Sequence, residues 1–185
     1  MASREKTNKL VLTALMMGII LIATMFIKVP IPFTQGYAHL GDAMIFLSVL
    51  LLGKRYGAVA AALGSAMGDV LGGFAIWAPW TFVIKGLMAL LMGAFIEQMV
   101  KKNKHHIKLF GVPVIEIAGM ALAGIEMVTG YYLAEGFIYG NWATPILGVP
   151  WNIGQFAVGM VIATALATAL YKTSMKNIFA IKKIQ

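Results

Sequence analysis

The stretch Leu10–Ile27, with the sequence LVLTALMMGIILIATMFI, is apolar almost throughout and carries no charged residue. A helix that crosses the hydrocarbon core of a bilayer needs about 20 mostly apolar residues, so this stretch predicts a membrane-spanning helix. Its basic flank also gives the start of the chain the form of a signal peptide. The apolar run is long for a signal peptide, however, and no small-x-small cleavage site precedes Lys28-Val29-Pro30. We therefore expect this first helix to be retained.

Further apolar segments follow along the chain, which has 60% hydrophobic residues and a mean hydropathy of +0.83. Such a composition lies far outside the range of soluble proteins. The sequence predicts an all-α integral membrane bundle of six transmembrane helices with ordered outer loops, in a single domain, 1–185. The second segment is short, so that helix must begin inside the preceding loop or span incompletely. The expected helices are Leu10–Ile27, Ala43–Gly53, Gly57–Ile76, Trp80–Val100, Leu109–Leu133 and Trp151–Tyr171.

The basic residues gather in alternate gaps between the apolar runs. Of the 15 Lys and Arg residues, all but Lys28 and Lys85 fall before the first run, between the second and third, between the fourth and fifth, or after the sixth. Cytoplasmic loops carry such an excess of basic residues, so the pattern predicts a multi-pass protein of the cell membrane with both termini cytoplasmic. The net charge of +8 then reflects topology. A nucleic-acid partner is not expected, because the charges are scattered over short loops.

Four charged residues fall inside the predicted helices, where charge is costly and is a functional hypothesis by default. Asp69 and Lys85 flank a very tight turn expected at Ala78-Pro79, so we expect them to pair at matching depth, as a structural ion pair or as ligand contacts. Glu126 lies at comparable depth in the fifth helix. Glu116 lies nearer the opposite end, where a structural or partner contact is favoured.

Aromatic and polar residues gather at the outer side, beneath two long connections, Lys28–Asp42 and Ala134–Pro150. An aromatic belt at the membrane interface explains about half of them. Flat side chains beside amide and charged groups also suit a small heteroaromatic ligand. Asn152 and Gln155 lie three residues apart, so they share one face of the sixth helix and are expected to point inward.

The sequence lacks the residues that several kinds of catalytic and metal site require. There is no cysteine, which excludes thiolate catalysis and thiolate metal sites. His105 and His106 lie in a lysine-rich loop without acidic ligands, so no metal site is expected. Neither a P-loop sequence nor a Ser-His-Asp or H-E-x-x-H arrangement occurs, so we expect no cofactor and no enzymatic activity in this chain.

Small residues recur at four-residue spacing on two predicted helices. Such stripes let helix backbones approach closely within lipid. On the third helix, Ala60, Gly64, Gly68 and Gly72 indicate internal packing. For Ala14 and Gly18 on the first helix, internal packing and docking to another subunit remain equally open.

Four segments together resemble the substrate-binding S component of an energy-coupling factor (ECF) vitamin transporter. They are Tyr37-Ala38-His39-Leu40-Gly41-Asp42-Ala43, Gly64-Ser65-Ala66-Met67-Gly68-Asp69-Val70-Leu71, Ala78-Pro79-Trp80-Thr81-Phe82-Val83-Ile84-Lys85-Gly86 and Pro150-Trp151-Asn152-Ile153-Gly154-Gln155. The resemblance covers essentially the whole chain and is closest to the riboflavin, hydroxymethylpyrimidine and pyridoxine branch.

The resemblance implies an outward-facing vitamin site closed by outer loops. It also implies two kinds of partner, a transmembrane coupling protein of the EcfT type and two cytoplasmic ATPases, which hydrolyse the ATP. The family's small-x-x-x-small docking motif maps onto Ala14 and Gly18, with Gly in place of the more usual second Ala. Family S components are thought to topple in the membrane to carry the ligand inward. Together with the outer polar groups, the resemblance gives these candidate substrate-binding residues: His39, Asp42, Asp69, Trp80, Lys85, Glu126, Tyr131, Trp142, Asn152 and Gln155.

The aromatic content favours a planar ligand, and the absence of a cationic cluster in the outer loops argues against a strongly anionic one. Pyridoxine or a hydroxymethylpyrimidine is therefore expected, with riboflavin as the alternative. Two other classes remain open. A stand-alone carrier would need an internal repeat or discontinuous helices, and neither is evident. An intramembrane enzyme would have to use Asp69, Glu126 and His39, which are dispersed along the sequence.

Overall fold

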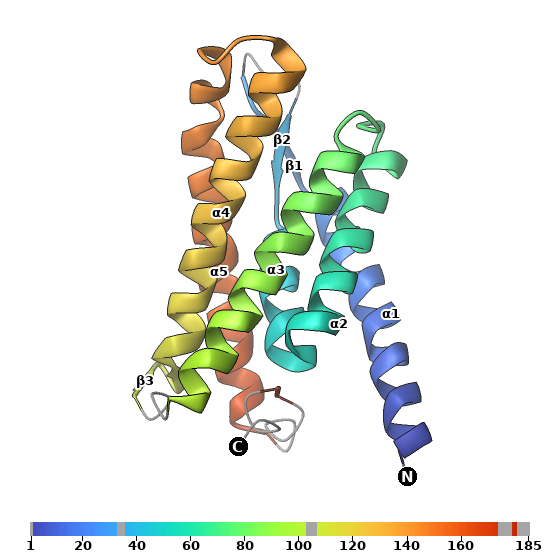
Figure 1. Ribbon diagram of the computed structural model, residues 1–185, viewed down its shortest axis with the longest axis vertical. Helices are drawn as coiled ribbons and strands as arrows, with labels where there is room; N and C mark the ends of the chain where they lie inside the picture. The colour runs from blue at the N-terminus through green and yellow to red at the C-terminus, as the bar shows by residue number, and fades with distance from the viewer. Residues whose placement is uncertain (1, 33–35, 103–106, 174–178, 181–185) are drawn as a thin grey trace.

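The computed structural model describes residues 2–32, 36–102, 107–173 and 179–180. Its long helices run along the molecule and surround a β-hairpin near one end (Figure 1). The start of α1 and the end of α5 lie together at the other end, which we call the basic end. The elements are α1 (Ala2–Phe26), β1 (Lys28–Pro30), β2 (Tyr37–His39), α2 (Gly41–Leu71), α3 (Ala78–Lys101), β3 (Lys108–Leu109), β4 (Val112–Pro113), α4 (Val114–Tyr139), the 3-10 helix η1 (Thr144–Leu147) and α5 (Val149–Tyr171).

The described residues contain five helices that are long and apolar enough to cross a membrane. The expected segments Ala43–Gly53 and Gly57–Ile76 both lie in α2, whose backbone leaves the helical conformation at Gly53, with φ 78° and ψ 178°. A methyl group added at Gly57 would lie 2.9 Å from the Val49 Cα, so the two halves of α2 pack directly on each other. The half before Gly53 begins at Gly41 and is about 18 Å long, well short of the roughly 30 Å hydrocarbon core. Six separate spanning helices are therefore not confirmed, whereas the all-α membrane architecture is.

Two predicted boundaries are wrong because turns and hairpins occupy the predicted helix ends. The turn between α2 and α3 runs through Gly72–Trp77, and Pro79 lies in the first turn of α3 rather than between the helices. A β-hairpin of β3 and β4 takes the expected start of the fifth helix, so α4 begins at Val114. At its other end α4 continues to Tyr139, where Gly140 with φ 65° ends it.

Parts of both outer connections form helices or strands. Residues of the first form the antiparallel β1–β2 hairpin, in which Lys28 is opposite His39 and Pro30 is opposite Tyr37. The second contains the last turns of α4, the helix η1 and the start of α5. Both connections therefore bring polar side chains to defined positions above the helices.

The α2 helix is the centre of the bundle, since it packs against α1, α3 and α5. Glycines set its distance from α1, because a methyl group at Gly64 would lie 2.8 Å from the Met17 carbonyl oxygen and one at Gly68 would lie 2.8 Å from the Thr24 side chain. Internal packing of this stripe is thus confirmed.

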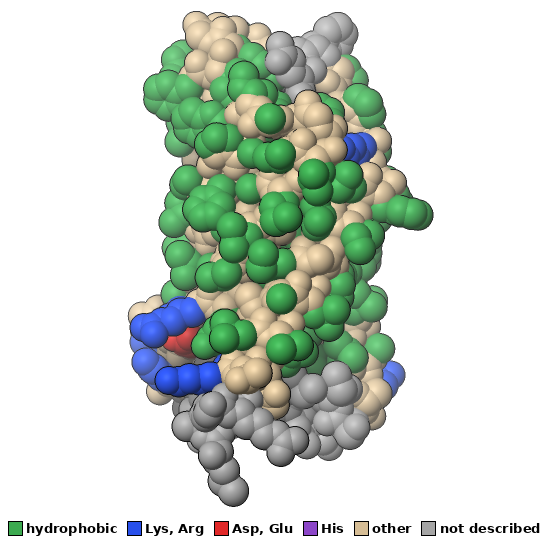
Figure 2. Space-filling view, turned by 90° about the vertical axis from the view of Figure 1, so that its right-hand side faces the viewer, with side chains coloured by type: hydrophobic (Ala, Val, Ile, Leu, Met, Phe, Trp, Pro, Cys, Tyr) green, Lys and Arg blue, Asp and Glu red, His purple; other side chains and the backbone are tan. Residues whose placement is uncertain are grey.

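Around the bundle, hydrophobic side chains cover the middle of the face seen in Figure 2, and basic side chains gather mainly toward one end.

Candidate functional site

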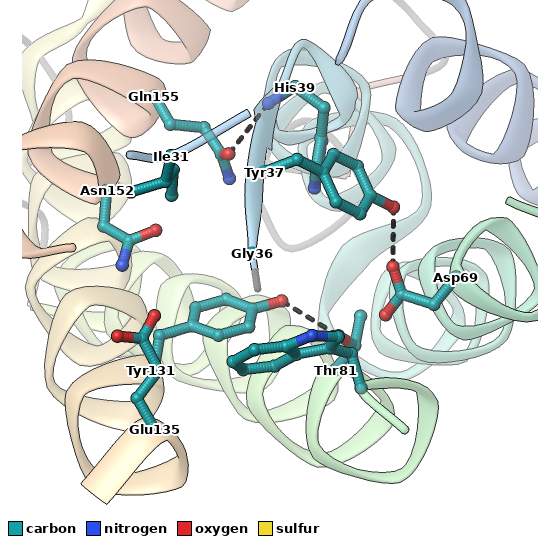
Figure 3. A pocket seen from close by; sticks show the side chains of 11 residues that line it. Ile31, Gly36, Tyr37, His39, Asp69, Thr81, Tyr131, Glu135, Asn152 and Gln155 are labelled. Atoms are coloured by element: carbon teal, nitrogen blue, oxygen red, sulfur yellow. Dashed lines mark hydrogen bonds between the residues drawn. The ribbon is translucent and has the colours of Figure 1, made fainter. Parts of the chain in front are cut away.

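A small cavity lies at the end of the molecule opposite the basic end. It is enclosed by the β1–β2 hairpin, the end of α2, the start of α3, the end of α4 and the start of α5 (Figure 3). Its volume of about 30 Å³ is room for about two water molecules. The lining residues are Ile31, Gly36, Tyr37, His39, Asp69, Trp77, Thr81, Tyr131, Glu135, Asn152 and Gln155.

A buried polar network lies directly beneath the cavity. The Lys85 ammonium donates to Asp42 Oδ1 at 2.5 Å, and both side chains are fully buried. Gln155 donates from Nε2 to Asp42 Oδ2 at 2.9 Å and accepts from the His39 backbone N–H at 2.9 Å through Oε1. Gln155 thus connects the charged pair on α2 and α3 to the β1–β2 hairpin.

The predicted ion pair between Asp69 and Lys85 is wrong. The structure pairs Lys85 with Asp42, while Asp69 accepts a hydrogen bond from the Tyr37 hydroxyl at 2.6 Å. The prediction rests on a tight turn at Ala78-Pro79 and leaves Asp42 in the outer connection Lys28–Asp42. The first half of α2 places Asp42 in the bundle centre, where α5 approaches closely because Gly159 has no side chain.

Two side chains of the hairpin have pKa values set mainly by burial. Burial, with the nearby Lys85 charge, lowers the pKa of His39 to about 4, so its ring is neutral near pH 7. The neutral ring accepts the Gly41 backbone N–H at Nδ1, at 3.0 Å. Burial and the neighbouring Asp69 raise the pKa of Tyr37 well above its ordinary value, so its hydroxyl remains a donor. His39 and Tyr37 therefore contribute neutral polar groups to the cavity lining.

Two carboxylates face the cavity with one oxygen each unused. Asp69 Oδ2 and Glu135 Oε2 are buried and have no hydrogen-bond partner among the described residues. Figure 3 shows the two carboxylates on opposite sides of the cavity in this view. Asp69 is among the residues predicted from the sequence, whereas Glu135 is not, because it falls in the predicted outer connection Ala134–Pro150. One feature of the sequence could have indicated a buried role for Glu135. It is an acidic residue in a nearly uncharged, apolar segment that directly follows the predicted fifth helix.

Aromatic rings form much of the cavity wall. Trp77 lies 6.4 Å from Tyr131 and 6.4 Å from Tyr139 between ring centroids. The Tyr131 hydroxyl is 3.1 Å from Thr81 Oγ1 and shares a hydrogen bond with it. Tyr37, also in the lining, packs 4.4 Å from Phe74. The cavity is therefore a flat-walled site with acceptor groups at its edges.

The ten predicted ligand residues divide into three groups in the structure. His39, Asp69, Tyr131, Asn152 and Gln155 line the cavity. Asp42 and Lys85 lie beneath it and reach it through Gln155, and Glu126 lies on α4 away from the lining. Trp80 and Trp142 are exposed and contact Phe137 on the outside of the bundle.

The remaining predicted residues lie outside the cavity lining. On α1, Ala14 is exposed, and a methyl group added at Gly18 would meet nothing within 4 Å, so this pair does not pack inside the bundle. Glu116 is buried and accepts from the Tyr171 hydroxyl at 2.6 Å, which gives it a structural contact. His105 and His106 lie outside the described residues. Within the described residues no cluster of His, Asp and Glu could hold a metal ion.

Comparison with known proteins identifies relatives over nearly the full chain. Residues 4–172 match the model of a family described as the ECF-type riboflavin transporter, S component. An uncharacterized protein from the gap 3′ region of Pyrococcus woesei is 35% identical over 151 residues, which cover 82% of this chain and 93% of the relative.

Two further comparisons bear on function and fold. The thiamine precursor transporter HmpT of Lactococcus lactis subsp. cremoris (strain MG1363) is 26% identical over 176 residues, covering 95% of each chain. A solved structure described as the S component of a bacterial ECF transporter matches with a TM-score of 0.65. It covers 89% of this chain and 96% of the other at 20% sequence identity, so it supports the fold alone.

Proposed function

Since the chain belongs to the family of ECF-type riboflavin transporter S components, we propose that it binds hydroxymethylpyrimidine or pyridoxine in the cavity of Figure 3. Family membership makes the chain a multi-pass membrane protein and a substrate-binding subunit of a transporter, not an enzyme. It also implies EcfT-type and ATPase partners. The ATPases, rather than this chain, would hydrolyse ATP.

The unused oxygens of Asp69 and Glu135 are the observation that supports a donor-rich ligand. A buried acceptor without a partner typically costs about 1–3 kcal/mol, and more when it is charged. An aminopyrimidine with a hydroxymethyl group, or a pyridine ring with hydroxyl groups, offers N–H or O–H donors around a flat ring. Such a ligand would satisfy both carboxylates while its faces pack against Trp77, Tyr131 and Tyr37.

The cavity must enlarge when a ligand binds. Its volume of about 30 Å³ is far below the roughly 300–1,000 Å³ of ligand pockets. The β1–β2 hairpin is held over the cavity by the Tyr37–Asp69 hydrogen bond and by the bond from the His39 backbone to Gln155. A ring-sized ligand would therefore require the hairpin to move away from the helices, which lengthens one or both of these bonds.

Riboflavin is the second candidate, because the matching family is described by that vitamin. It also carries donors, the ring N3–H and the hydroxyl groups of the ribityl chain, but its tricyclic ring would require a much larger expansion of the cavity of about 30 Å³. The relative named as a thiamine precursor transporter supports the smaller pyrimidine instead. We therefore place hydroxymethylpyrimidine and pyridoxine ahead of riboflavin.

Calorimetric titration of the purified subunit with all three compounds tests this proposal, with mass spectrometry of any ligand released on denaturation. We expect the pyrimidine or pyridoxine to bind most tightly, and Asp69→Asn and Glu135→Gln to weaken that binding. Glu126→Gln is the matched control, because Glu126 also has a buried oxygen without a partner among the described residues but does not line the cavity. Tighter binding of riboflavin, or equal effects of all three variants, would contradict the proposal.

We also propose that Ala14 and Gly18 contact the coupling protein. Both lie on the outside of α1, where a small-residue pair lets another helix approach closely.

A further inference from the structure

An apolar groove runs along the outside of the bundle between α4, α5 and the β3–β4 hairpin. Its volume is about 810 Å³, and it lies toward the basic end, away from the ligand cavity. One wall is a stripe of α5 at four-residue spacing, formed by Val161, Ala165 and Ala169. The two alanines are exposed and short, so they leave a hollow where larger side chains would stand out.

The opposite wall is the tip of the β3–β4 hairpin. Phe110 and Gly111 form its two-residue turn with φ values of 53° and 84°, a conformation that normally favours Asn or Gly at the first position. A phenylalanine in the left-handed region is strained by roughly 1–2 kcal/mol, yet Phe110 is 74% exposed and gains little from packing within the chain. Thr168 Oγ1 lies 2.9 Å from the Phe110 carbonyl oxygen and 2.7 Å from the Thr164 carbonyl oxygen, so its single proton is shared between this tip and the α5 backbone.

A single basic residue completes the lining at the basic end. Lys172 follows the last residue of α5 and lines the groove beside its apolar walls. It has no carboxylate within ion-pair distance in the part of the chain that the structure describes. Lys101, Lys102 and Lys108 lie on neighbouring segments at the same end, so the local field attracts an anion.

We propose that this groove binds an acyl chain of an anionic phospholipid, whose phosphate is held by the Lys172 ammonium group. The hydrocarbon tail fills the hollow over Ala165 and Ala169 and contacts the exposed Phe110 ring. The headgroup reaches the cation where the apolar walls end. Because the site lies at the end opposite the vitamin cavity, the inference does not depend on which vitamin is bound.

Charge argues against a second copy of this chain in the groove. Two copies with the same membrane orientation would meet basic end to basic end, which brings Lys172 and its neighbouring lysines close to the same residues of the other copy. Like charges in that arrangement repel each other. An anionic lipid instead supplies both the apolar chain and the opposite charge.

Native mass spectrometry of the purified subunit tests the proposal with phosphatidylglycerol and phosphatidylcholine of identical chains. We expect the wild type to retain phosphatidylglycerol about fivefold more strongly, since one lysine near an anionic lipid surface contributes roughly that factor. Lys172→Gln should remove this preference, and Ala165→Trp should reduce retention of both lipids. The matched controls are Lys6→Gln, an exposed lysine at the start of α1, and Ala157→Trp, an exposed alanine of α5 outside the groove.

Three results would overturn the proposal. The first is equal retention of the two lipids by the wild type. The second is a loss of preference in Lys6→Gln as large as in Lys172→Gln. The third is a dimer that Ala165→Trp dissociates, which would assign the groove to a second copy. Lys172→Gln changes only an exposed side chain, so this arm of the experiment holds even if Ala165→Trp does not fold.

Discussion

Among single residues, the fully buried pair of Lys85 and Asp42 has the largest expected effect on stability. Removing one partner leaves the other charge buried and unpaired, which typically costs about 3–5 kcal/mol. We expect Lys85→Met and Asp42→Asn each to lower the melting temperature of the purified subunit strongly. The double variant should lose less than the sum of the two, because it leaves no lone charge.

The half-exposed pair of Lys54 and Glu97 is the control for this prediction. Its side chains are 35% and 26% exposed, and Glu97→Gln should cost no more than about 1 kcal/mol. Strictly additive losses for Lys85 and Asp42 would show that the two charges do not stabilise each other. If Lys85→Met is instead non-additive with Asp69→Asn in its effect on the melting temperature, the pair of Asp69 and Lys85 expected from the sequence would be supported.

His39 gives the subunit a pH dependence of stability. Its pKa falls from an ordinary 6.5 to about 4 in the folded protein. Between these values the unfolded chain binds a proton that the folded chain does not, so stability falls as the pH falls. We expect a loss of about 2 kcal/mol between pH 7 and pH 5. Melting curves of wild type and His39→Asn at both pH values should show that the variant loses less, and an equal loss in both would exclude His39 as the cause.

Among the elements, α2 depends on one residue for its sharp bend. Gly53 has φ 78° and ψ 178°, a region that side-chain-bearing residues essentially never adopt. Gly53→Ala should therefore destabilise the subunit by about 1–3 kcal/mol in thermal melting. Gly154→Ala is the control, since a methyl group there would meet nothing within 4 Å inside a regular helix. The bend has another origin if the two variants melt at the same temperature.

The outer face of α1 and the contact between α1 and α2 should respond differently to bulky residues. Gly18→Leu is expected to abolish vitamin uptake by the complete transporter while the isolated subunit still binds its ligand, because Gly18 faces open space. Gly64→Leu should instead lower the stability of the isolated subunit, because Gly64 lies against the Met17 backbone. Uptake assays with the partner subunits and melting curves of the purified chain measure the two effects. Loss of ligand binding in Gly18→Leu would place this residue in the fold rather than in docking.

For the whole molecule, the segregation of charge predicts the orientation in the membrane. The start of α1 and the end of α5 lie at the same end (Figure 1), and the basic residues gather in the segments of that end. We expect a reporter fused after Gln185 to be cytoplasmic and one inserted near Asn141 to be external. A compartment-sensitive reporter assay in cells measures both positions. An external reporter after Gln185 would invert the proposed topology.

The sequence alone was enough to predict the membrane class, the helical architecture and about half of the cavity lining. Length and apolarity determine whether a segment can span a bilayer, and these are local properties that need no partner. The positions of Asn152 and Gln155 could likewise be predicted, since residues three apart on one helix share a face. The family resemblance rested on short segments that retain their order along the chain.

The tertiary structure alone decided which charges meet and which acceptors remain free. Lys85 pairs with Asp42 rather than Asp69 because the bend at Gly53 returns the first half of α2 into the bundle centre. Glu135 reaches the cavity because α4 continues beyond its apolar run to Gly140. Pairing depends on distances between segments far apart in the chain, and those distances follow from backbone bends and close helix packing. Local hydrophobicity carries no information about either, so the site's electrostatics appear only in the folded molecule.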